Sequence, residues 1–198
     1  ARGIAERLNL STTKAVETCS LAHDLGIPPF GHAGERTLHE LALNEDIDGY
    51  EGNAQTLRIL TTLEKKHHKY RGLNLTFRTL LGTIKYFNRF ESRQKSDDGG
   101  QCQQTKKEKF IYNDDYKMVF RNLEKNNLGT NENSSIDMQI MDLADDIAYA
   151  AHDLEDSLSM ELFSIDELLY EFKQSDKFQD SFGTLNDDLV EKAKEFAS

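Results

Sequence analysis

Four side chains that can bind a metal ion or transfer a proton lie within one stretch of fifteen residues, LAHDLGIPPFGHAGE, at 21–35. His23 and Asp24 are adjacent, and His32 and Glu35 follow them after two prolines and two glycines. An imidazole next to a carboxylate suits Mn, Fe, Zn or Ni better than a purely oxygen site does. Two ligands are too few to hold an ion, so a third ligand has to come from another part of the chain.

The loop between these two pairs predicts a proton-transfer role for the second pair. Gly26 and the two prolines end a helix that begins after Ser11 or Thr12, because proline cannot continue a helix and glycine tolerates the turn. A rigid loop would hold His32 at a defined distance from the first pair, with Glu35 three residues later to orient or charge the ring. A histidine held by a carboxylate is how a general acid or base is built.

The third ligand is sought in the longest predicted helix, IDMQIMDLADDIAYAAHDLEDSLSM at 136–160. Its apolar residues recur at helical spacing and predict a buried stripe, which consists of Ile136, Ile140, Leu143, Ile147, Ala151, Leu154 and Leu158. Asp145, Tyr149 and Asp153 follow one another at i, i+4 and i+8, so they share a different face.

The acidic residues of this helix leave two interpretations open. No Lys or Arg occurs from 136 to 172, although carboxylates one turn apart repel each other. The face is therefore either a solvated acidic surface or the place where carboxylates meet a cation, which would be a metal ion or a Lys or Arg from elsewhere.

Composition narrows the classes of function. The 198 residues carry a net charge of −11, which excludes broad binding to a phosphate backbone but not a local basic pocket for a nucleotide. Cys19 and Cys102 are isolated, which fits a reducing compartment better than a disulfide framework. No apolar run approaches the ~20 residues of a membrane span and no signal peptide is evident. We therefore expect a cytoplasmic protein that does not cross a membrane.

Helical periodicity dominates the chain, so we predict an all-α fold. No strand-like alternation extends beyond four or five residues. The helices expected after the 21–35 segment cover about 34–43, 53–63, 75–87, 112–127, 136–160 and 161–173, the last of them capped by Ser164. We expect one helical domain over 1–198, truncated at both ends, with an exposed or flexible loop at 91–109, where no apolar period exists.

Four sequence blocks, taken together and in this order, resemble the HD-domain superfamily of metal-dependent phosphohydrolases. The resemblance is closest to its dGTPase-like deoxynucleotide triphosphohydrolases. The blocks are HDLGIPPFGHAGE at 23–35, EGNAQTLRIL at 51–60, LNLTFRTLLGTIKY at 73–86 and MDLADDIAYAAHDLED at 141–156. The resemblance implies an HD-type helical bundle that forms part of a larger helical enzyme.

The resemblance also implies roles for individual residues. His23, Asp24 and Asp145 correspond to ligands of a divalent metal such as Mn, Mg or Fe, and His32 corresponds to the catalytic histidine with Glu35 as its carboxylate partner. A further metal-binding histidine of this family would lie one helix upstream of residue 1, outside this chain.

Four more positions correspond to contacts with the nucleotide. Tyr149 and Asp153 match residues that contact its phosphates and sugar, and Asn53 and Lys85 match other positions of the pocket. Ile27 departs from the pattern, because many relatives have a histidine there and isoleucine cannot donate a hydrogen bond to a phosphate.

The function implied is metal-dependent hydrolysis of a dNTP, with dGTP preferred, to a deoxynucleoside and inorganic triphosphate. The resemblance further implies a homo-oligomer, with single-stranded DNA or a nucleotide as an effector. Four cations could meet the substrate charge, namely Arg58, Lys85, Arg78 and Arg89. Two alternatives stay open: an HD phosphohydrolase that acts on a nucleoside monophosphate or cyclic nucleotide, and a catalytically silent subunit that binds dNTP within an oligomer.

Overall fold

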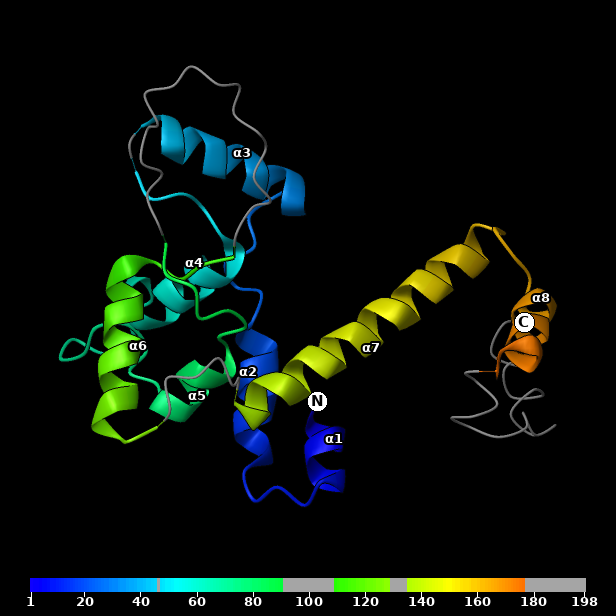
Figure 1. Cartoon of the computed structure of the whole chain (residues 1–198), viewed down its shortest axis with the longest axis horizontal. Coiled ribbons are helices and arrows are strands. Elements are labelled where there is room, and N and C mark those ends of the chain that lie inside the picture. Colours follow the sequence, from blue (N-terminus) through cyan, green and yellow to red (C-terminus); the bar gives the residue numbers. More distant parts are fainter. Residues whose placement is uncertain (46, 91–108, 129–134, 177–198) are drawn as a thin grey trace. The chain divides into compact units, whose positions relative to one another are not determined.

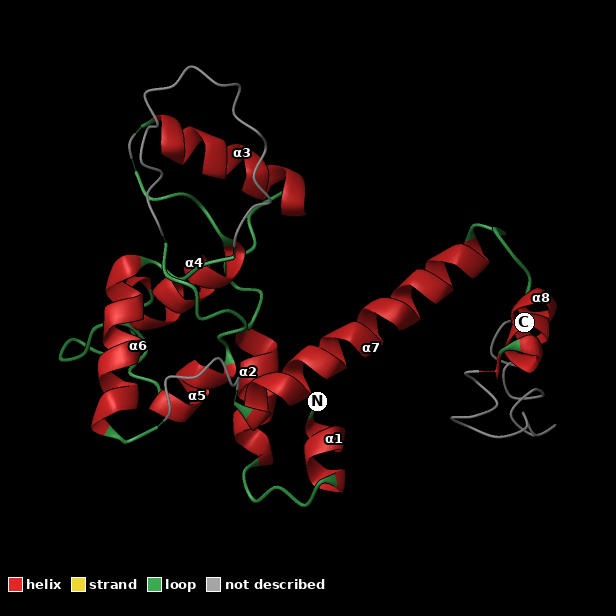
Figure 2. Cartoon of the chain, viewed as in Figure 1, coloured by secondary structure: helices red, strands yellow, loops and turns green. Residues whose placement is uncertain are grey.

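The computed structural model describes residues 1–45, 47–90, 109–128 and 135–176 (Figure 1). The helices over these residues are α1 (Arg2–Arg7), α2 (Thr13–Ala22), α3 (Gly31–Asn44), α4 (Gly52–Arg58), η1 (Ile59–Leu63), α5 (Phe77–Gly82), α6 (Asn113–Lys125), α7 (Ile136–Ser159) and α8 (Ile165–Gln174). These ranges contain no β-strand, and one isolated bridge joins Arg89 to Ile111 (Figure 2). The all-α prediction is confirmed.

The chain divides into two compact units, Ala1–Asp145 and Asp146–Ser198. The first unit holds α1 to α6 and the start of α7, up to Asp145. The second holds the remainder of α7 and α8. The expectation of a single domain over 1–198 stays a prediction. The loop expected at 91–109 lies outside the described residues, apart from Lys109.

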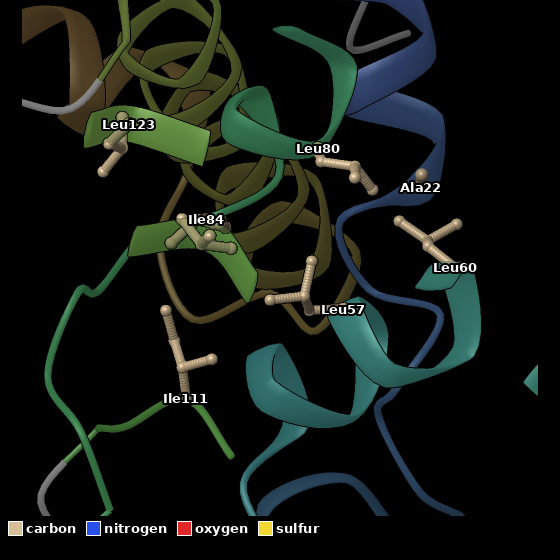
Figure 3. Close-up of a cluster of buried hydrophobic side chains, with 8 residues drawn as sticks. Ala22, Leu57, Leu60, Leu80, Ile84, Ile111 and Leu123 are labelled. Atoms are coloured by element: carbon tan, nitrogen blue, oxygen red, sulfur yellow. The ribbon is translucent and has the colours of Figure 1, made fainter. Parts of the chain in front are cut away.

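The core of the first unit forms where α2, α4, η1, α5 and α6 meet (Figure 3). Its buried apolar residues are Ala22, Leu57, Leu60, Leu80, Ile84, Ile111, Val119 and Leu123. Full burial of a Leu or Ile side chain contributes about 1.5–3 kcal/mol, so this cluster fixes the ends of α2 and α4. The end of α2 leads directly into His23 and Asp24.

Helix α3 begins at Gly31, three residues earlier than the predicted start near Gly34. Phe30 precedes it in the left-handed region at φ 68°, and Gly31 has φ 53°, so the chain reverses immediately after the two prolines. Gly34 then lies so close to the Pro29 carbonyl that any side chain would collide with it. His32 consequently lies in the first turn of a helix rather than in the preceding loop.

The apolar stripe predicted on α7 is buried only at Ile140. Ile136, Leu143 and Ile147 are about half exposed, so the prediction is wrong for them. Periodicity identifies an apolar face, but it does not tell whether another element covers that face. The capping prediction for α8 is confirmed, because the Ser164 hydroxyl accepts from the Glu167 amide within a capping box. No helix among the described residues is long and apolar enough to cross a membrane.

Candidate functional site

The backbone of the turn that carries His23 and Asp24 is hydrogen-bonded to a side chain of α4. The Thr56 hydroxyl donates to the His23 carbonyl and accepts from the Gly26 amide, both at 2.9 Å. The Tyr50 hydroxyl donates to the Gly26 carbonyl at 2.7 Å. Gly26 approaches the backbone of α4 so closely that a Cβ atom there would collide with it. The orientation of the His23 and Asp24 side chains therefore depends on α4.

His23, Asp24 and Asp145 converge, as the sequence predicts. One ligand atom from each lies within 4.8 Å of the other two. The Nε2 atom of His23 is 3.3 Å from Asp24 Oδ2 and 3.3 Å from Asp145 Oδ1. Asp145 lies on α7, whereas His23 and Asp24 follow α2, so the cluster depends on the packing of the first unit.

The surroundings of the two His23 ring nitrogens indicate whether this cluster fits a metal ion. Its Nδ1 atom lies 2.7 Å from the Ser20 carbonyl, which can only accept, so Nδ1 donates to Ser20 and Nε2 is the ring atom that faces the cluster. That Nε2 atom is buried and has no hydrogen-bond partner in the described structure. A histidine that donates one ring nitrogen to a backbone carbonyl and turns the other toward two carboxylates has the arrangement of a metal ligand. These residues therefore fit a divalent metal ion.

Lys85 supplies a positive charge beside the cluster. Its ammonium group donates to Asp145 Oδ2 at 3.0 Å and forms an ion pair with Asp142 at 3.0 Å. Burial lowers the pKa of Lys85, but the hydrogen bonds to Asp142 and Asp145 outweigh burial and leave this pKa above its ordinary value. Lys85 therefore stays charged and holds one oxygen of Asp145 while the other faces His23.

His32 and Glu35 form the second predicted pair, one turn apart in α3. The His32 Nδ1 atom lies 3.1 Å from Glu35 Oε2, and the other carboxylate oxygen accepts the Gly52 amide at 2.9 Å. The imidazole is 79% exposed, whereas the carboxylate is 7% exposed. A buried carboxylate that orients an exposed imidazole leaves its Nε2 atom available for proton transfer.

Asn53 lies in the first turn of α4, directly after the glycine that binds Glu35. Its side-chain amide donates to Glu51 Oε1 at 2.8 Å. Glu51 is completely buried, and the Lys109 ammonium also donates to it, at 2.9 Å. Asn53 thus follows the Gly52 amide that holds Glu35, and its own side-chain amide has Glu51 as a fixed partner.

Tyr149 and Asp153 lie on α7, one and two turns beyond Asp145. Tyr149 is 56% exposed and Asp153 is also exposed. Both belong to the second unit, and their contacts with a substrate stay predictions.

Three of the four cations considered for the substrate have other partners. Arg78 forms a bidentate ion pair with the buried carboxylate of Asp137, at 2.6 and 2.8 Å. Arg58 lies over the Tyr112 ring, and the Arg89 side chain donates to Asn113. Lys85 alone of these four contacts the cluster. His67 and His68 stack on each other in an exposed segment after η1.

Sequence reasoning missed the residues that support the site. Thr56, Tyr50 and Glu51 lie near or within a recognised block, but no spacing rule distinguishes their side chains as supports. Glutamate is not among the preferred N-cap residues, and Lys109 falls at the end of the segment predicted as a loop. Only the tertiary structure brings these residues together.

Comparison with known proteins gives related sequences over most of the chain. No family model matches it. The chain is 50% identical over 187 residues to the "Deoxyguanosinetriphosphate triphosphohydrolase-like protein 2" of Vibrio cholerae serotype O1, which covers 94% of this chain and 42% of that protein. It is 41% identical over 168 residues to a "Deoxyguanosinetriphosphate triphosphohydrolase-like protein" of Rickettsia bellii, covering 85% of this chain and 38% of the relative. A protein of the same name from Pelagibacter ubique is 37% identical over 169 residues, with 85% and 40% covered.

Proposed function

The chain belongs to the deoxyguanosinetriphosphate triphosphohydrolase-like proteins, and from that premise we propose that it carries the metal and acid–base centre of a dNTP triphosphohydrolase. The reaction is hydrolysis of a deoxynucleoside triphosphate, with dGTP preferred, to a deoxynucleoside and inorganic triphosphate. Because the chain spans about two fifths of the length of these relatives, with 42% and 38% covered in two of them, this activity is proposed for the whole protein.

The observation that carries the proposal is the convergence of the buried Nε2 atom of His23 with one oxygen each of Asp24 and Asp145, all within 4.8 Å of one another. A divalent ion such as Mn, Mg or Fe satisfies all three ligand atoms at once. When bound, such an ion neutralises phosphate charge and activates water. His23, Asp24 and Asp145 would hold it, and Lys85 would keep Asp145 in position and add a positive charge for the triphosphate.

The other site residues provide positioning and proton transfer. Cleavage between the α-phosphorus and the 5′ oxygen leaves an alkoxide that needs a proton, and His32 is the group proposed to donate it. Glu35 holds the His32 ring, because its carboxylate is fixed by the Gly52 amide. Asn53, Tyr149 and Asp153 are the residues proposed to hold phosphate and sugar. A close fit around the sugar would reject a 2′-hydroxyl group.

The proposal also covers the location of the enzyme, its oligomeric state and its effectors. We infer a cytoplasmic homo-oligomer whose activity responds to single-stranded DNA or to a second nucleotide. These inferences come from the family rather than from contacts in this chain.

The test is release of inorganic triphosphate from each of the four dNTPs by the full-length protein with Mn²⁺, alone and in pairs of nucleotides. Triphosphate as the product, with dGTP the fastest substrate, is the expected result. Turnover of a nucleoside monophosphate or cyclic nucleotide instead would assign the site to another phosphohydrolase reaction. Binding of dNTP without turnover would identify a silent subunit.

A further inference from the structure

We propose that Glu51 is a positioning residue that acts on the His32–Glu35 pair through the first turn of α4. This inference rests on the proposed function, because it assigns a part of the same site. Glu51 does not touch the reacting groups. It fixes the backbone amide that in turn fixes Glu35.

Glu51 is a buried charge whose acceptor atoms are in use. Its side chain is completely buried, and a carboxylate without partners would be costly in that position. Its Oε2 atom accepts the Ala54 amide at 2.8 Å, which caps α4. Its Oε1 atom accepts the Asn53 side chain at 2.8 Å and the Lys109 ammonium at 2.9 Å. One side chain therefore joins the helix start, a predicted substrate contact and a distant segment.

The path from Glu51 to the catalytic histidine is short. The next residue, Gly52, donates its amide to Glu35 Oε1 at 2.9 Å. The other oxygen of Glu35 lies 3.1 Å from His32 Nδ1. Because Glu51 is bonded covalently to Gly52 and clamps the turn through Ala54, the direction of the Gly52 N–H depends on the Glu51 carboxylate.

The identity of the residue that caps α4 also supports a positioning role for Glu51. Ser, Thr, Asp and Asn are the usual N-caps, whereas α4 is capped by a longer carboxylate. Its length brings the charge to Lys109, whose ammonium also lies over the Tyr86 ring at 5.8 Å. Burial lowers the pKa of Lys109, but the hydrogen bond to Glu51 together with the negative charges of Glu51 and Glu35 outweighs burial and raises this pKa overall. The ion pair thus locks the cap in one orientation.

The first measurement compares Glu51→Gln with the wild type. Glutamine can still cap Ala54, but it loses the attraction to Lys109. We expect kcat to fall about 10- to 100-fold, as for other groups that orient catalytic or metal-binding side chains. The affinity for Mn²⁺ should change by less than about twofold. KM reports separately on Asn53, whose side chain loses its acceptor on Glu51. The matched control is Glu124→Gln, a change at an exposed glutamate of α6 that should leave kcat unchanged.

A double-mutant cycle separates positioning from a general loss of structure. In the His32→Ala background, Glu51→Gln should lower kcat by no more than about twofold further, because its effect passes through the absent imidazole. A full additional loss in that background would overturn the inference. If Glu51→Gln does not fold, Lys109→Met is combined with His32→Ala in the same way, because it keeps the capping carboxylate of Glu51.

A readout without activity distinguishes this inference from the proposed function. Amide hydrogen exchange at Gly52 should become faster in Glu51→Gln or Lys109→Met, while exchange in α6 stays the same. A wild-type enzyme that releases triphosphate, together with an equally active Glu51→Gln, would overturn the inference alone. A wild type that is inactive on every dNTP would overturn the proposed function, and unchanged exchange at Gly52 would then also reject the role of Glu51.

Discussion

The metal-binding cluster and the His32–Glu35 pair are built in opposite ways. The cluster joins a turn after α2 to Asp145 of α7, so it exists only when the first unit is folded. The pair lies within a single turn of α3 and needs no distant segment to bring its members together. In the cluster, His23 and Asp145 are mostly buried and Lys85 pairs with Asp145, whereas His32 is largely exposed.

The metal-binding cluster and the His32–Glu35 pair nevertheless both depend on α4. Thr56 holds the turn of the cluster, and Gly52 holds the carboxylate of the pair. The proposed proton donor is therefore placed by local structure and held by one backbone contact, from the Gly52 amide to Glu35. The metal site instead requires two distant segments, the turn after α2 and helix α7, to converge. Changes to the cluster should therefore cost more than changes to the pair.

Removal of divalent metal is expected to have the largest effect. Treatment with a chelator should lower triphosphate release by about a thousandfold or more, because the ion supplies several kcal/mol of charge stabilisation. Added Mn²⁺ should restore the rate, and the protein should remain folded by circular dichroism. A rate that is unaffected by the chelator would contradict the assignment of the cluster.

His32→Ala should lower kcat by about 10²- to 10⁴-fold, the usual contribution of general acid–base catalysis. The affinity for Mn²⁺ should stay the same, because the imidazole lies outside the cluster. His68→Ala, at an exposed histidine, is the control. If His32→Ala weakened metal binding as strongly as it weakened catalysis, the metal-binding cluster and the His32–Glu35 pair would not be separate.

Lys85→Met should raise KM for the dNTP about tenfold, because a charge-assisted contact to the substrate is lost. The effect on kcat should be smaller than that of His32→Ala. Lys14→Met, at an exposed lysine of α2, is the matched control. An unchanged KM would restrict Lys85 to holding Asp142 and Asp145.

Cys19 gives the smallest and most local test. Burial raises the pKa of its thiol to about 11, so the unreactive protonated form dominates at pH 8. The thiol contacts the Thr79 carbonyl, and Gly82 approaches it too closely for a side chain. Alkylation followed by mass spectrometry should leave Cys19 unmodified in the folded protein and modify it in denaturant. Rapid labelling in the native state would mean that α2, and with it His23, is not fixed against α5.

The sequence predicts the chemistry of the site better than its supports. His23, Asp24, His32 and Glu35 stand out by type and spacing, and the resemblance of four sequence blocks adds Asp145 and the roles proposed for all five. The structure brings these residues together in two groups. The early start of α3 was missed because it depends on the left-handed backbone of Phe30. Thr56, Glu51 and Lys109 act through tertiary contacts that no local pattern encodes. The exposed apolar residues of α7 show the same limit, since coverage is a property of the packed molecule.

The affinity for Mn²⁺ tests the proposed metal site most directly. It is measured from the electron paramagnetic resonance signal of the free ion, for the wild type, Asp145→Asn and His32→Ala. We predict that the wild type and His32→Ala bind Mn²⁺ with equal affinity, and that Asp145→Asn binds it at least about tenfold more weakly. Equal binding by the wild type and Asp145→Asn would contradict the central claim that His23, Asp24 and Asp145 together hold the metal ion.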